Sequence, residues 1–180
     1  MTTISALQLE QAGSAAPILE QVKGQLGVIP NIFATMAHSA SVLEGFLAFS
    51  GSLANGSLSP QLREQIALTV AGVNTCDYCA SAHTVMAKGA GVSDEETKLN
   101  LAGGASDEKT AEILKFVSSV VSEKGRVPES AVQKIRDQGV NDAELVEILA
   151  NVGVNIFTNY FNHVADTEID FPFVSSKPLN

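Results

Sequence analysis

The stretch EQIALTVAGVNTCDYCASAH, residues 64–83, holds both cysteines of the chain and one of its three histidines. From Gln65 to Thr75 no residue is charged, which is typical of a helix that is enclosed on most sides. The fragment VNTC breaks this helix, with Thr75 as the expected cap, so that Cys76 falls in the first turn of a second helix. The stretch therefore predicts two consecutive helices, over about 60–73 and 77–88.

The same helical pattern continues in both directions. Apolar residues recur at helical spacing, and the punctuating residues are those that begin and end helices rather than hairpins. Ser59 is an expected N-cap, and Ser93 with Glu96 has the spacing of a capping box. Asn141 with Glu144 has the same spacing. Helices are expected to begin at both capping boxes, the second leading into the apolar stretch LVEILANVGVNIFTNYFNHVA, residues 145–165, and further helices are expected over about 17–26, 40–54, 107–123 and 129–137. The predicted fold is all-α.

The C-terminal third ends in a long, nearly uncharged helix, which should be buried on most faces, followed by an extended arm over residues 166–180. The segment IPNIFATMAHS, residues 29–39, is expected to be core or subunit interface. AGVN at 71–74 and VGVN at 152–155 are alike, which leaves an internal helical repeat open. The 180 residues, of which 45% are hydrophobic, fit a single domain spanning 1–180.

Composition excludes several classes of function. Lys and Arg total 11 against 20 Asp and Glu, and a net charge of −9 repels nucleic acid and anionic membrane surfaces. No run approaches the roughly 18 to 20 apolar residues of a membrane span, and the N-terminus lacks a signal-peptide pattern, so a cytoplasmic location is expected. No phosphate loop or dinucleotide fingerprint occurs, so we expect no cofactor beyond the dithiol itself.

The two cysteines and His83 form the candidate site. On a helix, their offsets of zero, three and seven residues bring Cys76, Cys79 and His83 within roughly 60° of one another. The helix N-terminus favours a thiolate at Cys76, while His83 lies one turn after Cys79 and can accept its proton. A peroxide oxidises one such thiolate to a sulfenic acid, which the second thiol converts to a disulfide. This spacing therefore indicates redox chemistry.

Glu64 is the candidate partner of His83. It lies twelve residues before Cys76, at the start of the uncharged stretch, where a low-dielectric setting would favour its pairing with the imidazole. A carboxylate in that place orients a histidine that acts as a base. The hypothesis is a Glu64–His83–cysteine proton relay.

This spacing resembles a known pattern. Glu64, eleven residues, Cys76, two residues, Cys79, three residues and His83 is similar to the motif of the AhpD-like alkylhydroperoxidases in the carboxymuconolactone decarboxylase superfamily. NYFNHVADTEIDFP, residues 159–172, resembles the C-terminal segment of its peroxidase-related branch, and the likeness runs from about 29 to 172.

The resemblance implies an all-helical fold, a homo-oligomer such as a trimer or hexamer, and peroxide reduction through the cysteine pair, with Glu64 and His83 relaying protons. Decarboxylases of the superfamily lack the cysteine pair, so decarboxylation is disfavoured. Tyr78 departs from the pattern, because the well-known members carry a histidine at that place between the cysteines.

The roles of the two cysteines stay open. We expect Cys79 to attack the peroxide and Cys76, as the more exposed thiol, to resolve the sulfenic acid, although the roles could be exchanged. A lipoyl-like or thioredoxin-like dithiol would then be the reductant.

Three other interpretations remain. The pair could be two small buried hydrophobic residues, or a disulfide carrier that serves a separate peroxiredoxin. It could also bind zinc, but the fourth ligand would then have to come from His38 or His163 through folding. We expect His163 to be a core histidine with a satisfied hydrogen bond.

Overall fold

The computed structural model describes residues 2–177, and within that range the chain is all-α, as predicted. Two short 3₁₀ helices, η1 and η2, precede nine α-helices, and no strand occurs among these residues. The elements are η1 Leu9–Gln11, η2 Gly13–Ala15, α1 Ala16–Leu26, α2 Asn31–Met36, α3 Ala40–Ala54, α4 Pro60–Asn74, α5 Asp77–Gly89, α6 Asp94–Leu101, α7 Glu108–Ser122, α8 Glu129–Asp137 and α9 Asp142–Ala165.

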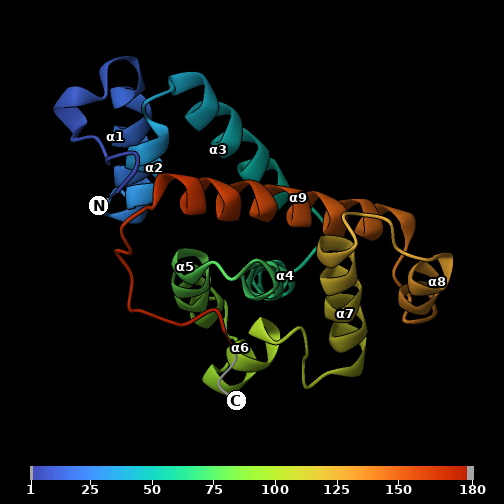
Figure 1. Ribbon diagram of the computed structural model, residues 1–180. Helices are drawn as coiled ribbons and strands as arrows, with labels where there is room; N and C mark the ends of the chain where they lie inside the picture. The colour runs from blue at the N-terminus through green and yellow to red at the C-terminus, as the bar shows by residue number, and fades with distance from the viewer. Residues whose placement is uncertain (1, 178–180) are drawn as a thin grey trace.

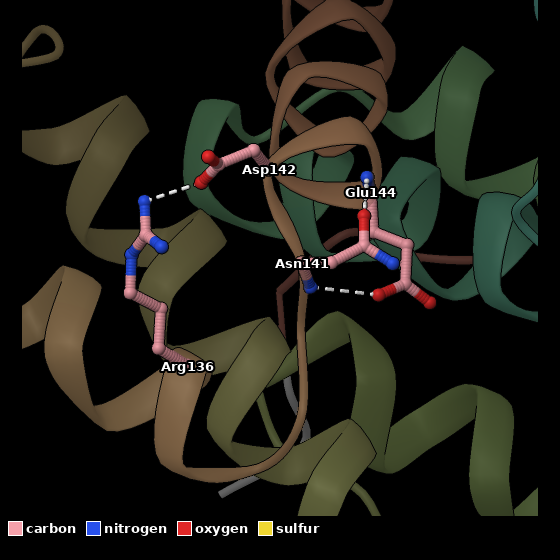
Figure 2. Close-up of polar contacts among 4 residues, drawn as sticks. All are labelled: Arg136, Asn141, Asp142 and Glu144. Atoms are coloured by element: carbon pink, nitrogen blue, oxygen red, sulfur yellow. Dashed lines mark hydrogen bonds and ion pairs between the residues drawn. The ribbon is translucent and has the colours of Figure 1, made fainter.

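The predicted caps account for most helix boundaries. The Ser59 hydroxyl accepts the Leu62 amide at 3.1 Å and so starts α4. Asn141 and Glu144 exchange both bonds of a capping box, at 2.9 and 3.0 Å, at the start of α9 (Figure 2). Local side chains thus fix where these helices begin.

The capping box predicted at α6 is only half present. Ser93 accepts the Glu96 amide at 3.2 Å, as expected. The Glu96 carboxylate, however, accepts the amide and the hydroxyl of Ser106 at 3.1 and 2.5 Å, which ties α6 to the loop before α7. Long-range partners for this carboxylate were not visible from local spacing.

One helix was not predicted, and one expected cap was wrong. Residues 31–36 form helix α2, whose six residues are too few for helical periodicity to be recognised. Thr75 is the left-handed C-cap of α4, with φ of 55°, and it is Cys76 itself that caps α5. The break between the helices is therefore one residue shorter than predicted.

Helix α4 is the centre of the bundle. It packs against α5, α6, α7 and α9, and its residues 66–71 are all buried. In Figure 1, α9 runs the length of the molecule, with α1–α3 on one side of it and α4–α7 on the other. AGVN lies in α4 and VGVN in α9, two helices in contact, but the internal repeat stays a prediction.

The described part of the C-terminal arm passes α5 on its way toward α6 (Figure 1). Its Val174 amide donates to the Ser81 hydroxyl at 2.9 Å, and its Ser176 amide donates to Asp77 at 2.8 Å. The arm is thus tied to the first turns of α5, while residues 178–180 of the predicted arm lie outside the described residues. Within the described range, no helix has the length and apolar character needed to cross a membrane.

Candidate active site

The cysteine pair lies at the junction of α4 and α5. The Cys76 amide donates to the Ala71 carbonyl at 3.0 Å, which closes α4, and the Cys76 sulfur then accepts the Cys79 amide at 3.3 Å, which opens α5. Cys76 and Cys79 are joined as a disulfide, with their Cα atoms 5.3 Å apart. A helix that starts at a cysteine N-cap therefore brings both sulfurs together.

The expectation that Cys76 is the more exposed thiol was wrong. Cys76 is 1% exposed and Cys79 is 2% exposed, so both sulfurs are buried alike. Both belong to one apolar cluster, against which Phe161 of α9 and Phe171 and Val174 of the arm also pack. The cluster includes residues that are far from the cysteines in sequence, which the spacing around the cysteines could not reveal.

Glu64 and His83 pair across α4 and α5. The Glu64 carboxylate lies 2.8 Å from the His83 Nδ1. An ionised carboxylate can only accept hydrogen bonds, so Nδ1 carries the proton and Nε2 is left free to exchange one. Their side chains are 21% and 19% exposed, so the pair is less enclosed than the uncharged stretch suggested.

Asn162 of α9 is a site residue that the sequence did not reveal. Its Nδ2 donates to the Cys79 sulfur at 3.3 Å, and its side chain is 4% exposed. His163, expected in the core, is exposed instead, because one step along a helix rotates a side chain by about 100°. The available signal was a row of asparagines at helical spacing in an apolar helix.

Tyr78 fixes the turn between the cysteines. Its hydroxyl donates to Asp170 of the arm at 2.9 Å and accepts the Ile32 amide at 3.2 Å. Its ring meets Phe171 edge-on, with centroids 5.7 Å apart. Burial, above all, raises the pKa of this phenol, so that it stays neutral. Tyr78 therefore anchors α5 to α2 and to the arm.

No metal centre is formed around these residues. The part of the chain that the structure describes contains no group of three or more His, Cys, Asp or Glu side chains arranged to hold a metal ion. His38, one of the two proposed fourth ligands, is exposed and pairs through Nε2 with the Ser5 carbonyl at 3.0 Å. The zinc interpretation gains no support from this geometry.

Comparison with known proteins gives one family match, which covers the segment with the candidate site residues, and several structures with a similar fold. The carboxymuconolactone decarboxylase family model matches residues 40–108, which contain Glu64, both cysteines and His83. No curated protein matches the sequence.

Three solved structures share the fold. An uncharacterized peroxidase-related protein from Silicibacter sp. TM1040 is 22% identical, with a TM-score of 0.80 over 92% of this chain and 91% of that one. An AhpD-core, peroxidase-related protein from Ralstonia eutropha JMP134 is 20% identical, with a TM-score of 0.82 over 93% of each chain. The debrominase Bmp8, in complex with 2,3,4-tribromopyrrole, is 18% identical, with a TM-score of 0.80 over 94% of this chain and 92% of that one.

The family match and the shared fold agree with the pattern of Glu64, Cys76, Cys79 and His83 from which the sequence analysis began. Residues 40–108 thus match the carboxymuconolactone decarboxylase family model, and the chain shares its fold with an AhpD-core protein.

Proposed function

We propose that the protein is a thiol peroxidase that reduces organic hydroperoxides or hydrogen peroxide through the Cys76–Cys79 pair. The observation that carries the proposal is the 2.8 Å contact between Glu64 and His83, one turn after a bonded cysteine pair. A histidine whose Nδ1 is held by a carboxylate is oriented to exchange protons through Nε2. Since the pair is partly exposed and the sulfurs are buried, it offers protons a route between solvent and the dithiol.

The proposed cycle transfers two electrons from the dithiol to the peroxide. The Cys79 thiolate attacks one peroxide oxygen, so that an S–O bond forms while the O–O bond breaks, and the departing alkoxide takes a proton from His83. Cys76 gives its proton to His83 and attacks the Cys79 sulfenic acid, which forms the S–S bond and releases water. An external dithiol then returns the pair to its reduced form.

The burial of the disulfide bears on the reductant. With 1% and 2% of the two cysteines exposed, a broad protein surface cannot reach either sulfur without rearrangement. A narrow, lipoyl-like dithiol meets less obstruction than a thioredoxin-like one. For the same reason, the alternative role as a disulfide carrier for a separate peroxiredoxin has less support than direct reaction with a small peroxide.

A thiol count tests the proposal. Reduced protein is treated with one equivalent of an organic hydroperoxide, and free thiols are counted over time in wild type, Glu64→Gln, His83→Ala and, as a control, His38→Ala. We expect fast loss of both thiols, slowed roughly 10²-fold or more in His83→Ala and unchanged in His38→Ala, because general acid–base catalysis contributes about that much. Thiols that do not react with peroxide contradict the proposal.

Two further reagents separate the alternatives. Rapid exchange with dihydrolipoamide but no peroxide turnover would identify the disulfide carrier. Because the debrominase Bmp8 shares the fold, a brominated pyrrole is included as a substrate. If the thiols are lost with the brominated pyrrole and not with the peroxide, the proposed activity would be reductive debromination and not peroxide reduction.

We also propose that copies of the chain assemble. Large apolar side chains are exposed along one side of α9, at separations of three, eight, three and four residues, and continue onto α3. They are Val146, Leu149, Phe157, Tyr160 and Val164 of α9, with Val42 and Phe49 of α3. We call these seven residues the α3/α9 face. Its size and apolar character are typical of a surface that another subunit covers.

A further inference from the structure

Asn162 contacts a sulfur atom of the dithiol directly. Its Nδ2 lies 3.3 Å from the Cys79 sulfur, and the two side chains are 4% and 2% exposed. Its Oδ1 is buried and has no hydrogen-bond partner among the described residues. This oxygen belongs to the same amide group whose nitrogen contacts the sulfur.

The chemistry of the sulfur decides which way the amide faces. A disulfide sulfur carries lone pairs and no hydrogen, so only the NH₂ group of Asn162 can form a hydrogen bond with it. The reverse orientation would set an oxygen against a sulfur without a proton and leave two buried N–H groups without partners. The NH₂ group therefore faces Cys79.

Two other asparagines of α9 pair within their own helix, while Asn159 accepts a hydrogen bond from Asn74 of α4 at 3.0 Å. Asn151 and Asn155 donate to carbonyl groups one turn back in their own helix, those of Glu147 and Asn151, both at 2.8 Å. Asn155 is 6% exposed, close to the 4% of Asn162. Burial on this helix face is thus compatible with local pairing, and Asn162 is distinguished by its contact with Cys79.

We propose that Asn162 is a further catalytic residue, whose NH₂ group stabilises the Cys79 thiolate that attacks the peroxide. Negative charge resides on the Cys79 sulfur in this species, and a hydrogen bond to a charged group is stronger than one to a neutral group. The free Oδ1 accepts the O–H of the incoming hydroperoxide and so holds its oxygens beside the sulfur. The inference rests on the proposed function and assigns Cys79, not Cys76, as the attacking thiol.

The test uses single-cysteine protein, in which Cys76→Ser leaves only Cys79. The rate of alkylation by iodoacetamide is measured against pH with intact Asn162, with Asn162→Ala and with Asn162→Asp. We expect alkylation at pH 7 to fall about tenfold in Asn162→Ala, because one hydrogen bond to the thiolate is lost. Asn162→Asp, which keeps the volume but sets a carboxylate against the sulfur, should fall further.

Asn155→Ala is the matched control, since it removes a buried asparagine of the same helix that does not touch the dithiol. Circular dichroism and thermal melting show that each variant is folded. The proposal is overturned if the alkylation rates of Asn162→Ala and Asn162→Asp stay within twofold of the rate of the single-cysteine protein with intact Asn162. An equal shift in Asn155→Ala also overturns it, because the effect would then be a general loss of packing.

A second readout keeps this proposal separate from the proposed function. The same proteins are treated with hydroperoxide, and the sulfenic acid on Cys79 is trapped with a 1,3-diketone. Slower trapping in both Asn162 variants, with Asn155→Ala unchanged, supports the catalytic role. If Cys79 alkylates with the expected dependence on Asn162 but never forms a sulfenic acid, thiolate stabilisation stands and the peroxidase proposal fails.

Discussion

Tyr78 occupies the place between the cysteines at which the resemblance led us to expect a proton-handling histidine. Its hydroxyl is held by Asp170 and Ile32, and burial raises the pKa of the phenol, so it stays protonated where a peroxidase would work. Its proton is donated to Asp170 and its oxygen accepts the Ile32 amide, so the hydroxyl is occupied on both sides. In the proposed cycle, proton transfer is therefore left to His83, and Tyr78 links α5 to α2 and to the arm.

Removal of that link should cost stability. We expect Tyr78→Phe to lower the free energy of unfolding by about 1 to 2 kcal/mol, because a buried hydroxyl that makes two hydrogen bonds is lost. Urea denaturation at pH 7 measures the change. Tyr160→Phe is the control, since Tyr160 is 56% exposed and should change stability by less than about 0.5 kcal/mol. Equal effects of the two substitutions would contradict the role of Tyr78.

The same phenol predicts a pH dependence. The pKa of Tyr78 is raised in the folded state, so folding favours its neutral form, and that contribution is complete below the unfolded value of about 10. Above that pH the unfolded chain loses the proton first, and stability falls as the pH rises. We expect urea midpoints between pH 9 and 11 to fall more steeply in wild type than in Tyr78→Phe. Parallel curves for the two proteins would rule this out.

The site shows which residues local spacing can predict. Cys76 is the N-cap of α5, Cys79 and His83 lie within this helix, and Glu64 lies on the helix directly before it. Sequence spacing could therefore predict most of their relative positions. Asn162 lies 83 residues from Cys79, and only the packing of α9 on α5 brings them together. Cys76 is buried in an apolar cluster built from several helices and the C-terminal arm, so its exposure could not be predicted from the spacing around it.

At the scale of elements, the α4–α5 pair depends on how closely α4 approaches its other neighbours. A Cβ atom on Gly72 would overlap the carbonyl oxygen of Leu101, the last residue of α6. Because backbone atoms cannot move aside as a flexible side chain can, glycine is required at this crossing. Gly72 therefore sets the position of α6 against the helix that carries Glu64.

We expect Gly72→Ala to destabilise the protein by about 1 to 3 kcal/mol through overpacking. Gly24→Ala in α1 is the matched control, since a Cβ there meets no atom within 4 Å. That substitution should stabilise the protein by about 0.5 to 1 kcal/mol, because alanine is the better helix former. Chemical denaturation measures both, and a stabilising Gly72→Ala would show that α6 can shift.

The start of α9 tests how much a cap contributes. Figure 2 shows the two bonds of the Asn141–Glu144 capping box beside the ion pair of Arg136 with Asp142. We expect Asn141→Ala to cost about 1 kcal/mol, since amides at the helix start lose their acceptor. Arg136→Ala should cost less than about 0.5 kcal/mol, because the side chain of Asp142 is 81% exposed and water screens the pair. Denaturation midpoints measure both changes in stability. A larger loss of stability in Arg136→Ala than in Asn141→Ala would contradict this ranking.

These elements also mark what a single sequence can predict of the fold. Helices with a capping residue and several turns of periodic pattern, such as α4, α7 and α9, were predicted within a residue or two of their bounds. Helix α2 was missed because its six residues make less than two turns, and its position depends on Tyr78 and Asp170, which are distant in sequence. Local signals predict where helices start, whereas tertiary contacts decide which short segments become helical.

For the whole molecule, the unusual feature is where apolar surface remains. Helix α9 buries the asparagines of one side against α4 and α5 and exposes a row of large apolar side chains on another, including Val146 at 65% and Val164 at 69%. A groove of about 280 Å³ runs between α3 and α9, lined by Phe46, Phe49 and Phe157 among others. Exposure of this kind along a whole helix is costly in water unless another surface covers it.

Assembly through the α3/α9 face can be tested by solution mass. We expect the wild-type protein to sediment as an oligomer well above its monomer mass of 18.8 kDa. Val164→Asp combined with Phe157→Asp should shift it to the monomer, since each charge would have to be buried in the contact. The control is Leu26→Asp, which places a carboxylate on a side chain 57% exposed at the end of α1.

The outcome also bears on catalysis, because α9 presents Asn162 to Cys79 from its inner side and the α3/α9 face from another. If subunit contact holds α9 in place, the monomeric variant should stay folded but react more slowly with peroxide. A wild-type protein that sediments at 18.8 kDa at micromolar concentration would contradict the assembly. A monomeric variant with undiminished thiol reactivity would show instead that the bundle alone positions Asn162, with α9 held by α4 and α5.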